Sequence, residues 1–248
     1  MKIGYILKWD KNQQSIANIT LQNHKDYCDK HEYTLIVDTG VWDQSRNGMW
    51  MKHVAIMRAL RNNDYNDIDW FFWSDIDVLI MNQTITLESI LQQCDYDKYN
   101  IIASKWAPDT GFPFFNQLSS KFVQKLAMTS KFFFTIHTGN FFIKNNSNSY
   151  KLIHSIYTDR RFRQKDISDY QTGDEIGFVI YYLAYPDIRK QIYFLPIEQL
   201  HIVPSEDKLN TFKHYECGDF LVHANYRSIE EKVTVLKKYY DNYRSTIR

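Results

Sequence analysis

Two aspartates one residue apart, Asp75 and Asp77, lie within the most apolar stretch of the chain, residues 69–82. Aromatic and aliphatic side chains precede and follow the pair, a pattern typical of a central strand that is covered on both faces. Because an unpaired buried carboxylate is very costly, we expect the acids where the strand ends, at the carboxyl edge at which open α/β sheets bind ligands. Alternate residues of an extended chain project to one side, so the two carboxylates could hold one Mg²⁺ or Mn²⁺ that carries a diphosphate.

The spacing of two aspartates is by itself a weak signal. The 21 aspartates among 248 residues should give about two Asp-x-Asp triplets by chance. Three occur, and they are Asp67/Asp69, Asp75/Asp77 and Asp95/Asp97. The first and the third lie in polar stretches, where we expect solvated loop acids. Only the middle pair has apolar sequence on both sides, so we interpret it as the metal site of a glycosyltransferase that uses a sugar nucleotide. The alternative is a cap at the end of a strand.

Further polar residues lie next to apolar segments. A tetrapeptide between two such segments consists of His137, Thr138, Gly139 and Asn140. Its side chains could contact a sugar or acceptor hydroxyl, and the alternative is a β-turn or a bulge at Gly139. His223 follows a late apolar segment, where it could be a third metal ligand or a histidine with a structural role. Imidazole is acceptable to Mn²⁺ and unusual for Mg²⁺.

Two acids begin a helix that we predict after residue 173. Thr172 and Glu175 have the spacing of a capping box, so Glu175 could simply close the first turn. Alternatively, Asp174 or Glu175 is the carboxylate that faces the sugar, because a helix amino terminus directed into a cleft presents its first acids there. The two roles are compatible.

The nucleotide is expected at the carboxyl ends of the first strands. Lys8 follows a strand predicted at 2–7, and Lys52 lies on a helix predicted at 50–61, for which Asn47 is the expected cap. Lys52 could reach a phosphate, and the alternative is a solvated lysine. The expected nucleotide and phosphate contacts are Tyr5, Lys8, Lys52, Ser74 and Asp75.

Strand and helix signals alternate along the chain. We expect strands at 2–7, 33–38, 99–104, 132–136, 141–144, 192–196 and 218–226, and a central strand within 69–82 that ends at its acids. Helices are expected at 15–31, 50–61, 86–93, 117–130, 149–161 and after 173. Residues 111–115 could form an aromatic acceptor wall, and Ser228 with Glu231 has the spacing of a capping box that opens a final helix. This order predicts one α/β domain over residues 1–248, with a mixed, mostly parallel sheet flanked by helices.

Composition narrows the class of protein. The net charge of +1, from 30 basic and 29 acidic residues, provides no field that would recruit nucleic acid or anionic membrane. The three cysteines, Cys28, Cys94 and Cys217, are far apart, which argues against a zinc ribbon or a disulfide scaffold and indicates a reducing compartment. Residues 1–8 resemble neither a signal peptide nor a membrane anchor. We therefore expect a cytoplasmic protein without a transmembrane segment, and the alternative is a lumenal catalytic domain separated from its anchor.

From Trp50 to Tyr226 the chain resembles the galactosyl/mannosyl/xylosyltransferase family of fungal Golgi and plant enzymes. The most specific match is residues 69–82 (DWFFWSDIDVLIMN), which are similar to the family's WxWWxDxDxxIMN strand; Trp50 to Lys52 are similar to the Trp-x-Lys/Arg start of its preceding helix. Three shorter segments are similar to NTGxFLIRN, DQxALxxLL and GDxxVHFAG of the family, and these are 137–145, 174–175 with the helix that follows, and 218–223.

Four departures from the family pattern are visible. His137 replaces an Asn, Glu175 replaces a Gln and adds a charge near the donor, residues 224–226 replace Phe-Ala-Gly, and the Golgi membrane anchor is missing.

The resemblance implies a GT-A, Rossmann-like nucleotide-diphospho-sugar transferase. Residues from 1 to about 82 would bind the sugar nucleotide, and residues from about 83 to 248 would bind the acceptor and supply the metal-ligating histidine. Asp75, Asp77 and His223 would hold Mn²⁺ or Mg²⁺, and Asp174 and Glu175 would be catalytic.

The implied reaction is retaining transfer of a hexose or pentose from a nucleotide diphosphate sugar to a hydroxyl of a glycan or glycoprotein. A UDP-sugar is the favoured donor and GDP-mannose a possible one. Two mechanisms stay open: attack on the face that the diphosphate leaves, and double displacement with Asp174 or Glu175 as nucleophile.

Two other classes of protein share parts of the pattern. A sugar nucleotidyltransferase also uses paired acids and a metal, but it needs a glycine-rich phosphate loop after the first strand, and residues 8–15 contain no glycine. An inactive carbohydrate-binding protein would keep the aromatic residues but would not need the paired acids.

Overall fold

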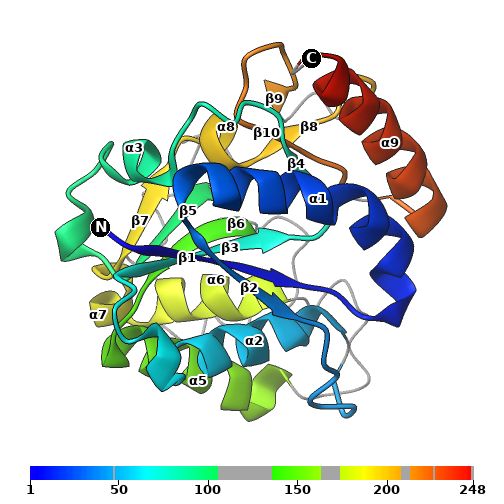
Figure 1. Ribbon diagram of the computed structural model, residues 1–248. Helices are drawn as coiled ribbons and strands as arrows, with labels where there is room; N and C mark the ends of the chain where they lie inside the picture. The colour runs from blue at the N-terminus through cyan, green and yellow to red at the C-terminus, as the bar shows by residue number, and fades with distance from the viewer. Residues whose placement is uncertain (47, 106–135, 163–173, 208–212, 226, 247–248) are drawn as a thin grey trace.

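The computed structural model of the chain describes residues 1–46, 48–105, 136–162, 174–207, 213–225 and 227–246 (Figure 1). A six-stranded sheet has the order β2-β1-β3-β6-β5-β7. Its strands are β1 Ile3–Lys8, β2 Thr34–Asp38, β3 Trp70–Asp75, β5 Ile101–Lys105, β6 Ile136–Lys144 and β7 Ile192–Leu195. Of these six described strands, β6 alone runs against the others. The predicted α/β class, with a mixed and mostly parallel sheet flanked by helices, is confirmed.

Helices cover both faces of this sheet (Figure 1). The described helices are α1 Gln14–His31, α2 Met51–Ala59, α3 Leu87–Leu91, α5 Ser147–Thr158, α6 Asp174–Ala184, α7 Pro186–Arg189, α8 Ile197–Leu200 and α9 Ile229–Thr246. Helices α1 and α9 lie on one side of the sheet, and α2, α5 and α6 lie on the other. Two short ladders complete the described strands, β4 Val78–Ile80 with β10 Leu221–His223, and β8 Ile202–Val203 with β9 Lys213–His214.

The aromatic run of β3 supplies both hydrophobic cores. Trp70 and Phe72 pack into the core beneath α1 and α9, whereas Phe71 and Trp73 pack into the core beneath α2, α5 and α6. Successive residues of a strand point to opposite faces, so a strand covered on both sides must be apolar at every position. The apolar pattern that precedes Asp75 is thus a consequence of a central place in the sheet.

The acids of segment 69–82 lie where β3 ends, as predicted, and the apolar residues after them form a second strand in another sheet. β3 ends at Asp75, Ile76 and Asp77 form a turn, and β4 then pairs antiparallel with β10. Two polar side chains of α1 bind the departing backbone: Thr20 Oγ1 donates to the Ile76 carbonyl (2.7 Å), and Asn23 accepts from the Ile80 amide (2.7 Å). These bonds compensate the backbone groups that leave the main sheet.

We predicted that the tetrapeptide 137–140 separates two strands. It lies instead inside a single strand, β6. Ala103 of β5 pairs with Phe141 and Ser104 pairs with His137, so residues 138–140 bulge away from β5. On the other side Asn140 keeps its register with Ser74 of β3. The alternative of a bulge at Gly139 is therefore correct, because β3 holds the strand together while β5 shifts past it.

Of the other predicted elements, one strand is shorter than expected, one capping box is confirmed, and several lie outside the described residues. The last strand, predicted at 218–226, is only Leu221–His223, because its partner β4 has three residues. The predicted capping box of the final helix is confirmed, since the Ser228 amide donates to Glu231 (2.8 Å) and the Glu231 amide donates to Ser228 Oγ (3.3 Å). Outside the described residues lie the aromatic loop 111–115, the helix 117–130, the strand 132–136 except for its last residue, and the caps Asn47 and Thr172.

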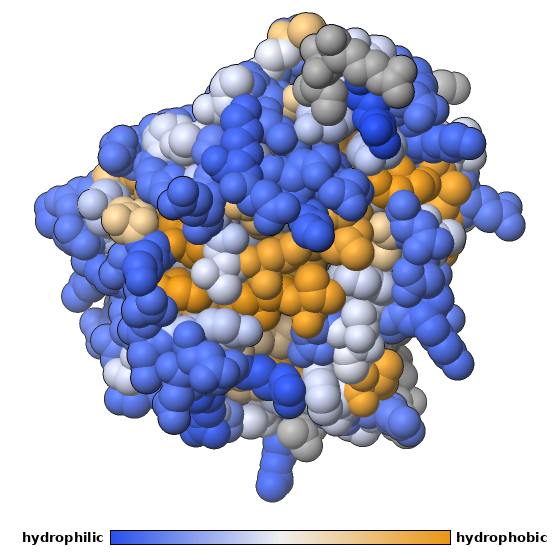
Figure 2. Space-filling model, viewed as in Figure 1, coloured by the Kyte–Doolittle hydropathy of each residue, from blue (hydrophilic) through white to orange (hydrophobic). Residues whose placement is uncertain are grey.

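A groove of about 840 Å³ follows the edge strand β2 and is bordered by α2 and α5. Figure 2 shows apolar side chains gathered on this face between α1 and α2. Val37 and Trp42 are large hydrophobic residues that stay exposed here, and Trp42 Nε1 donates to Asp38 (2.9 Å) at the carboxyl end of β2. No helix among the described residues is both long enough and apolar enough to cross a membrane.

Candidate active site

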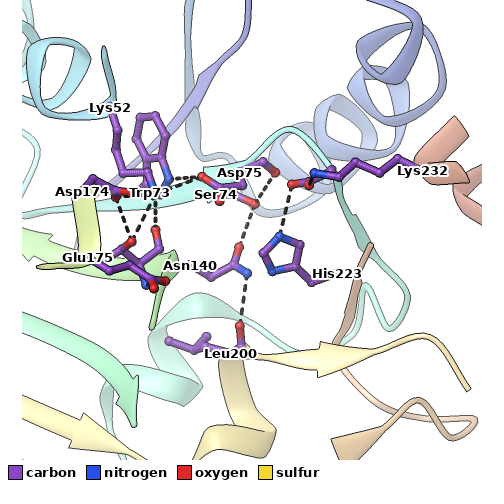
Figure 3. Close-up of polar contacts among 12 residues, drawn as sticks. Lys52, Trp73, Ser74, Asp75, Asn140, Asp174, Glu175, Leu200, His223 and Lys232 are labelled. Atoms are coloured by element: carbon purple, nitrogen blue, oxygen red, sulfur yellow. Dashed lines mark hydrogen bonds and ion pairs between the residues drawn. The ribbon is translucent and has the colours of Figure 1, made fainter. Parts of the chain in front are cut away.

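Asp75, Asp77 and His223 converge at the carboxyl end of β3. One side-chain oxygen or nitrogen of each residue lies within 4.8 Å of those of the other two. The ladder of β4 with β10 brings them together, because His223 pairs with Val78 and the Ala224 amide donates to the Asp77 carbonyl (3.0 Å). His223 Nε2 is 3.1 Å from Asp77 Oδ1. The three residues predicted as metal ligands therefore lie side by side, as Figure 3 shows for Asp75 and His223.

The chemistry of these three side chains fits a divalent cation. Two carboxylates and one imidazole are a donor set that Mn²⁺ accepts more readily than Mg²⁺. Asp77 and His223 are buried, whereas the Asp75 side chain keeps 30% of its surface exposed. A ligand could therefore enter the site from the side of Asp75. Burial raises the pKa of Asp75, against the effect of Lys52.

A lysine of the last helix binds the same carboxylate. Lys232 Nζ of α9 lies 2.5 Å from Asp77 Oδ2, whereas His223 contacts Oδ1 of that carboxylate. Figure 3 shows Lys232 extending to the site above His223. Burial by itself would raise the pKa of Asp77, but His223 and Lys232 outweigh it and hold that pKa below its ordinary value. Sequence reasoning missed Lys232, because a lysine in the first turn of an amphipathic helix has no local signal that marks it as part of a site.

Lys52 is the centre of a second group of charges. Its Nζ lies 2.9 Å from Asp174 Oδ2, 3.2 Å from Asp75 Oδ1 and 2.6 Å from the Thr138 carbonyl oxygen. Burial would lower the pKa of Lys52, but Asp174 and Asp75 outweigh it, so the pKa lies above its ordinary value. Lys52 is thus a buried cation between two acids and not the solvated lysine of the alternative interpretation.

The amino terminus of α6 brings Asp174 and Glu175 to the bulge of β6. Thr138 Oγ1 donates to Asp174 Oδ2 (2.8 Å), and the Thr138 amide donates to Glu175 Oε1 (3.4 Å). Burial, and then the neighbouring Asp174, raise the pKa of Glu175 to about 8. Glu175 is therefore mostly protonated at neutral pH in this arrangement.

Ser74 of β3 and Asn140 of β6 are buried next to these charged side chains and bind each other. Ser74 Oγ donates to Asn140 Oδ1 (2.8 Å), and Asn140 Nδ2 donates to the Leu200 carbonyl (3.1 Å) at the end of α8 (Figure 3). Both side chains are buried, and their hydrogen bonds to each other and to Leu200 hold in place the strands that carry the site. Trp73 Nε1 donates to Asp75 Oδ1 (2.8 Å) and orients that carboxylate.

Two further predicted nucleotide contacts lie on β1. Lys8 pairs in register with Asp75 on one side and Asp38 on the other, and its Nζ donates to the Gly40 carbonyl (2.8 Å). Burial lowers the pKa of Lys8. Tyr5 has no exposed surface, and its hydroxyl is paired with His24 Nδ1 (2.8 Å). Because Tyr5 points into the core beneath α1, we do not retain it as a nucleotide contact.

His137 lies in a cluster that the sequence did not indicate. It is buried beside His201, which follows α8, with ring centroids 3.7 Å apart, and both are close to His223. His137 is 1% exposed, so it presents almost no surface to a sugar hydroxyl. A single histidine between an apolar helix end and a strand carries no pattern, and His201 was therefore missed.

The other acid pairs lie at the surface, as predicted. Asp67 binds Lys2, and Asp95 and Asp97 bind Lys98 and Lys144, with at least 56% of each of these three carboxylate side chains exposed. Asp69 accepts from the Lys2 amide (2.7 Å) in an exposed position.

Comparison with known proteins identifies relatives of the chain. The model of the galactosyl transferase GMA12/MNN10 family matches residues 5–227. The chain is 24% identical over 215 residues to the probable alpha-1,6-mannosyltransferase MNN10 of Saccharomyces cerevisiae. The matched region is 81% of this chain and 51% of that protein. The chain is 21% identical over 224 residues to an alpha-1,2-galactosyltransferase of Schizosaccharomyces pombe, with coverage of 84% and 55%. The chain thus spans about half the length of these relatives.

Solved structures share the fold. A glycosyltransferase involved in glycosylation of the major capsid of PBCV-1 has a TM-score of 0.65 at 13% identity, over 96% of this chain and all of that one (100%). The bifunctional glycosyltransferase WbbM has a TM-score of 0.55 at 10% identity, over 98% of this chain and 51% of that one. At these identities the likeness is one of fold alone.

Proposed function

This chain belongs to the galactosyl transferase GMA12/MNN10 family, and from that premise we propose that it is a metal-dependent, retaining glycosyltransferase. The donor would be a nucleotide diphosphate sugar, with a UDP-sugar favoured over GDP-mannose, and the acceptor a hydroxyl of a glycan or glycoprotein. The observation that carries the proposal is the convergence of Asp75, Asp77 and His223 at the carboxyl end of a central strand. That edge is where open α/β sheets bind their ligands.

Mn²⁺ or Mg²⁺ would be held by Asp75, Asp77 and His223. When bound, the cation supplies Lewis-acid stabilisation of the charge that develops on the leaving diphosphate, typically worth several kcal/mol. Lys232 would move from Asp77 Oδ2 and stay near enough to contribute a second positive charge.

The nucleoside part of the donor would extend from Asp75 toward β2. Asp38 lies two strands from Asp75 at the same edge, with Lys8 between them, so the two ends of this row are roughly 10 Å apart at the usual strand spacing. The exposed ring of Trp42 and the groove along β2 begin there. We propose this end for the base, with Lys8 near the phosphates.

The surroundings of the acids favour attack without a covalent enzyme intermediate. Asp174 Oδ2 is bound by both the Lys52 ammonium and the Thr138 hydroxyl, which leaves it a weak nucleophile. Glu175, with its raised pKa, would be protonated at neutral pH and equally weak. In the proposed step the acceptor oxygen attacks the anomeric carbon as the bond to the diphosphate breaks, and the acceptor proton passes to a diphosphate oxygen.

Two names of relatives agree with retention. Both are called alpha-transferases, and an α-linked donor gives an α-linked product when configuration is retained. In this scheme Asp174 positions Lys52 and Thr138, while protonated Glu175 could donate a hydrogen bond to a sugar hydroxyl.

The test is to incubate the protein with several nucleotide sugars and Mn²⁺ and to measure release of the nucleoside diphosphate. Asp75→Asn and Asp77→Asn should reduce release by at least about 100-fold, because each removes a ligand of the cation. Asp97→Asn changes an exposed aspartate of another Asp-x-Asp triplet, Asp95/Asp97, and should leave the rate unchanged. Full activity of Asp75→Asn or Asp77→Asn in EDTA, or no release from any donor by the folded wild type, would refute the proposal.

A further inference from the structure

A second group of possible metal ligands adjoins the first within the described residues. His137, His201 and His223 each offer a ring nitrogen, and these atoms lie within 4.8 Å of one another. All three side chains are buried, and they come from β6, from the residue after α8 and from β10. From this cluster we propose that the protein binds a borderline-soft divalent cation, such as Zn²⁺, through three imidazoles, at a site separate from the carboxylate site.

The environment of His223 favours this role. Its Nε2 faces Asp77 Oδ1 at 3.1 Å, and its Nδ1 has no hydrogen-bond partner among the described residues. A histidine that ligates zinc usually donates its other ring N–H to a carboxylate, which fixes the tautomer and makes the ligating nitrogen more basic. Asp77 can take this part, so that Nδ1 of His223 is the nitrogen that faces the cluster.

The backbone of the bulge is shaped for close approach of two imidazoles. A Cβ atom at Gly139 would lie 2.5 Å from Cε1 of both His137 and His223, and 3.0 Å from His223 Nδ1. Asn140 then ties this strand to the Leu200 carbonyl, one residue before His201. The three ligands are therefore held by a bulge, a ladder and a hydrogen-bonded helix end, which is the rigidity that a preorganised site needs.

The donor set determines the class of cation. Three imidazole ligands without a carboxylate ligand suit Zn²⁺, Co²⁺ or Cu²⁺ better than Mg²⁺ or Mn²⁺, which prefer oxygen. Burial lowers the pKa of both His137 and His201, which favours the neutral form that can ligate a metal. Zinc–nitrogen bonds of about 2.0–2.1 Å in a tetrahedral site place ligand nitrogens roughly 3.3 Å apart, which small side-chain rotations can reach from the present spacing.

Sharing of His223 couples the two sites. A neutral imidazole has one lone pair to offer and one N–H. When Nδ1 of His223 binds the cation of the imidazole site, Nε2 keeps its proton for Asp77 and cannot ligate a cation held by Asp75 and Asp77. Occupation of the two sites is therefore competitive. This coupling rests on the proposed function of the carboxylate site, whereas the three-imidazole site does not.

The test is direct titration of the metal-free protein with Co²⁺ and Zn²⁺, read by visible absorption of Co²⁺ and by calorimetry. We expect a stoichiometric site with the intense visible bands of tetrahedral Co²⁺. His201→Gln and His137→Gln should each weaken Co²⁺ binding at least about tenfold and abolish these bands. Asp75→Asn should keep them, because Asp75 belongs only to the carboxylate site. His154→Gln, an exposed histidine of α5, is the matched control and should bind like the wild type.

Zinc-edge X-ray absorption of the wild type gives a readout that needs no variant. A first shell with three imidazole nitrogens supports the proposal, and a shell made mainly of oxygen overturns it. Equal Co²⁺ binding by the wild type, His137→Gln and His201→Gln, or loss of the tetrahedral bands in Asp75→Asn, also overturns it. The coupling is tested separately by Mn²⁺ electron paramagnetic resonance: Zn²⁺ should release bound Mn²⁺ from the wild type, and failure to do so refutes the coupling alone.

Discussion

The ammonium group of Lys52 has three hydrogens and three close acceptors. Asp174, Asp75 and the Thr138 carbonyl account for all of them. A buried charge is tolerated only when its hydrogen bonds are satisfied by partners of this kind. In the proposed reaction Lys52 would therefore act on the donor through Asp75 and Asp174, whose positions it fixes, and it would contact a phosphate only after releasing one of them.

Glu175 makes stability depend on pH. Its pKa is about 8 in the folded protein against an ordinary 4.5, so folding takes up a proton between these values. The stabilisation is fully present below about pH 4.5 and is lost as the pH rises through 8. Glu175→Gln should flatten this part of the pH profile and be more stable than the wild type above pH 8. Urea unfolding of the metal-free protein across this range measures the effect.

The exposed Glu198 of α8 provides the control for that experiment. Glu198→Gln should follow the wild-type profile at every pH. Profiles of the wild type and Glu175→Gln that run parallel from pH 4.5 to 8 would mean that Glu175 is ionised in the fold.

Lys232 should compete with a divalent cation for Asp77. Its Nζ is 2.5 Å from Asp77 Oδ2, so a cation that takes this oxygen must displace the ammonium. Lys232→Gln should raise the affinity for Mn²⁺ by roughly tenfold, which corresponds to about 1.4 kcal/mol. Electron paramagnetic resonance of free Mn²⁺ measures the change. Lys238→Gln, on the same helix but paired with Glu206, should have no effect; unchanged or weaker Mn²⁺ binding by Lys232→Gln would show that Lys232 does not compete.

At the scale of elements, the site depends on three short irregular features: the turn after β3, the bulge in β6 and the ladder of β4 with β10. The sequence predicted the carboxyl end of β3 correctly, because a run that is apolar at every position must stop before its acids. It did not indicate that the apolar residues after the acids pair in another sheet, because that change of sheet depends on Thr20 and Asn23 of a distant helix.

The bulge in β6 should tolerate no side chain at Gly139. A Cβ atom there would approach His137 and His223 to 2.5 Å, and the backbone of both neighbours is fixed by strand pairing. Gly139→Ala should therefore lower the free energy of unfolding by about 1–3 kcal/mol, the usual cost of overpacking, and should weaken Mn²⁺ binding by displacing His223. Chemical unfolding and Mn²⁺ titration measure the two effects.

Gly48→Ala is the matched control, since the nearest atom to a Cβ at that position is 3.6 Å away. It should change stability by less than about 0.5 kcal/mol. Wild-type stability and Mn²⁺ affinity in Gly139→Ala would show that His137 and His223 can move apart without cost.

At the scale of the whole molecule, the site joins segments that are far apart in the sequence. Residues at strand ends were predictable, because a parallel sheet gathers the carboxyl ends of its strands at one edge; Lys8 and Asp75 are examples. The sequence did not predict whether a residue of these strands faces a ligand or the core. Ser74 and Tyr5, both expected to contact the nucleotide, are buried. His201 and Lys232 reach the site only through α8 and α9, whose packing against the sheet no local pattern encodes.

The types of atom that would bind the cation should determine how much Mn²⁺ and Mg²⁺ each stabilise the folded protein against heat. A ligand that binds only the folded state at about 100 times its dissociation constant adds about 2.7 kcal/mol, or roughly 5–10 °C in the unfolding midpoint of a protein of this size. Because one of the three proposed ligands is an imidazole, Mn²⁺ should raise the midpoint more than Mg²⁺ at equal concentration, and EDTA should reverse both shifts. His223→Gln should narrow the difference between the two ions, whereas His154→Gln should preserve it. Calorimetric scans of the three proteins with each ion give the six midpoints, and a wild type stabilised equally by both ions would mean that His223 is not a ligand of the carboxylate site.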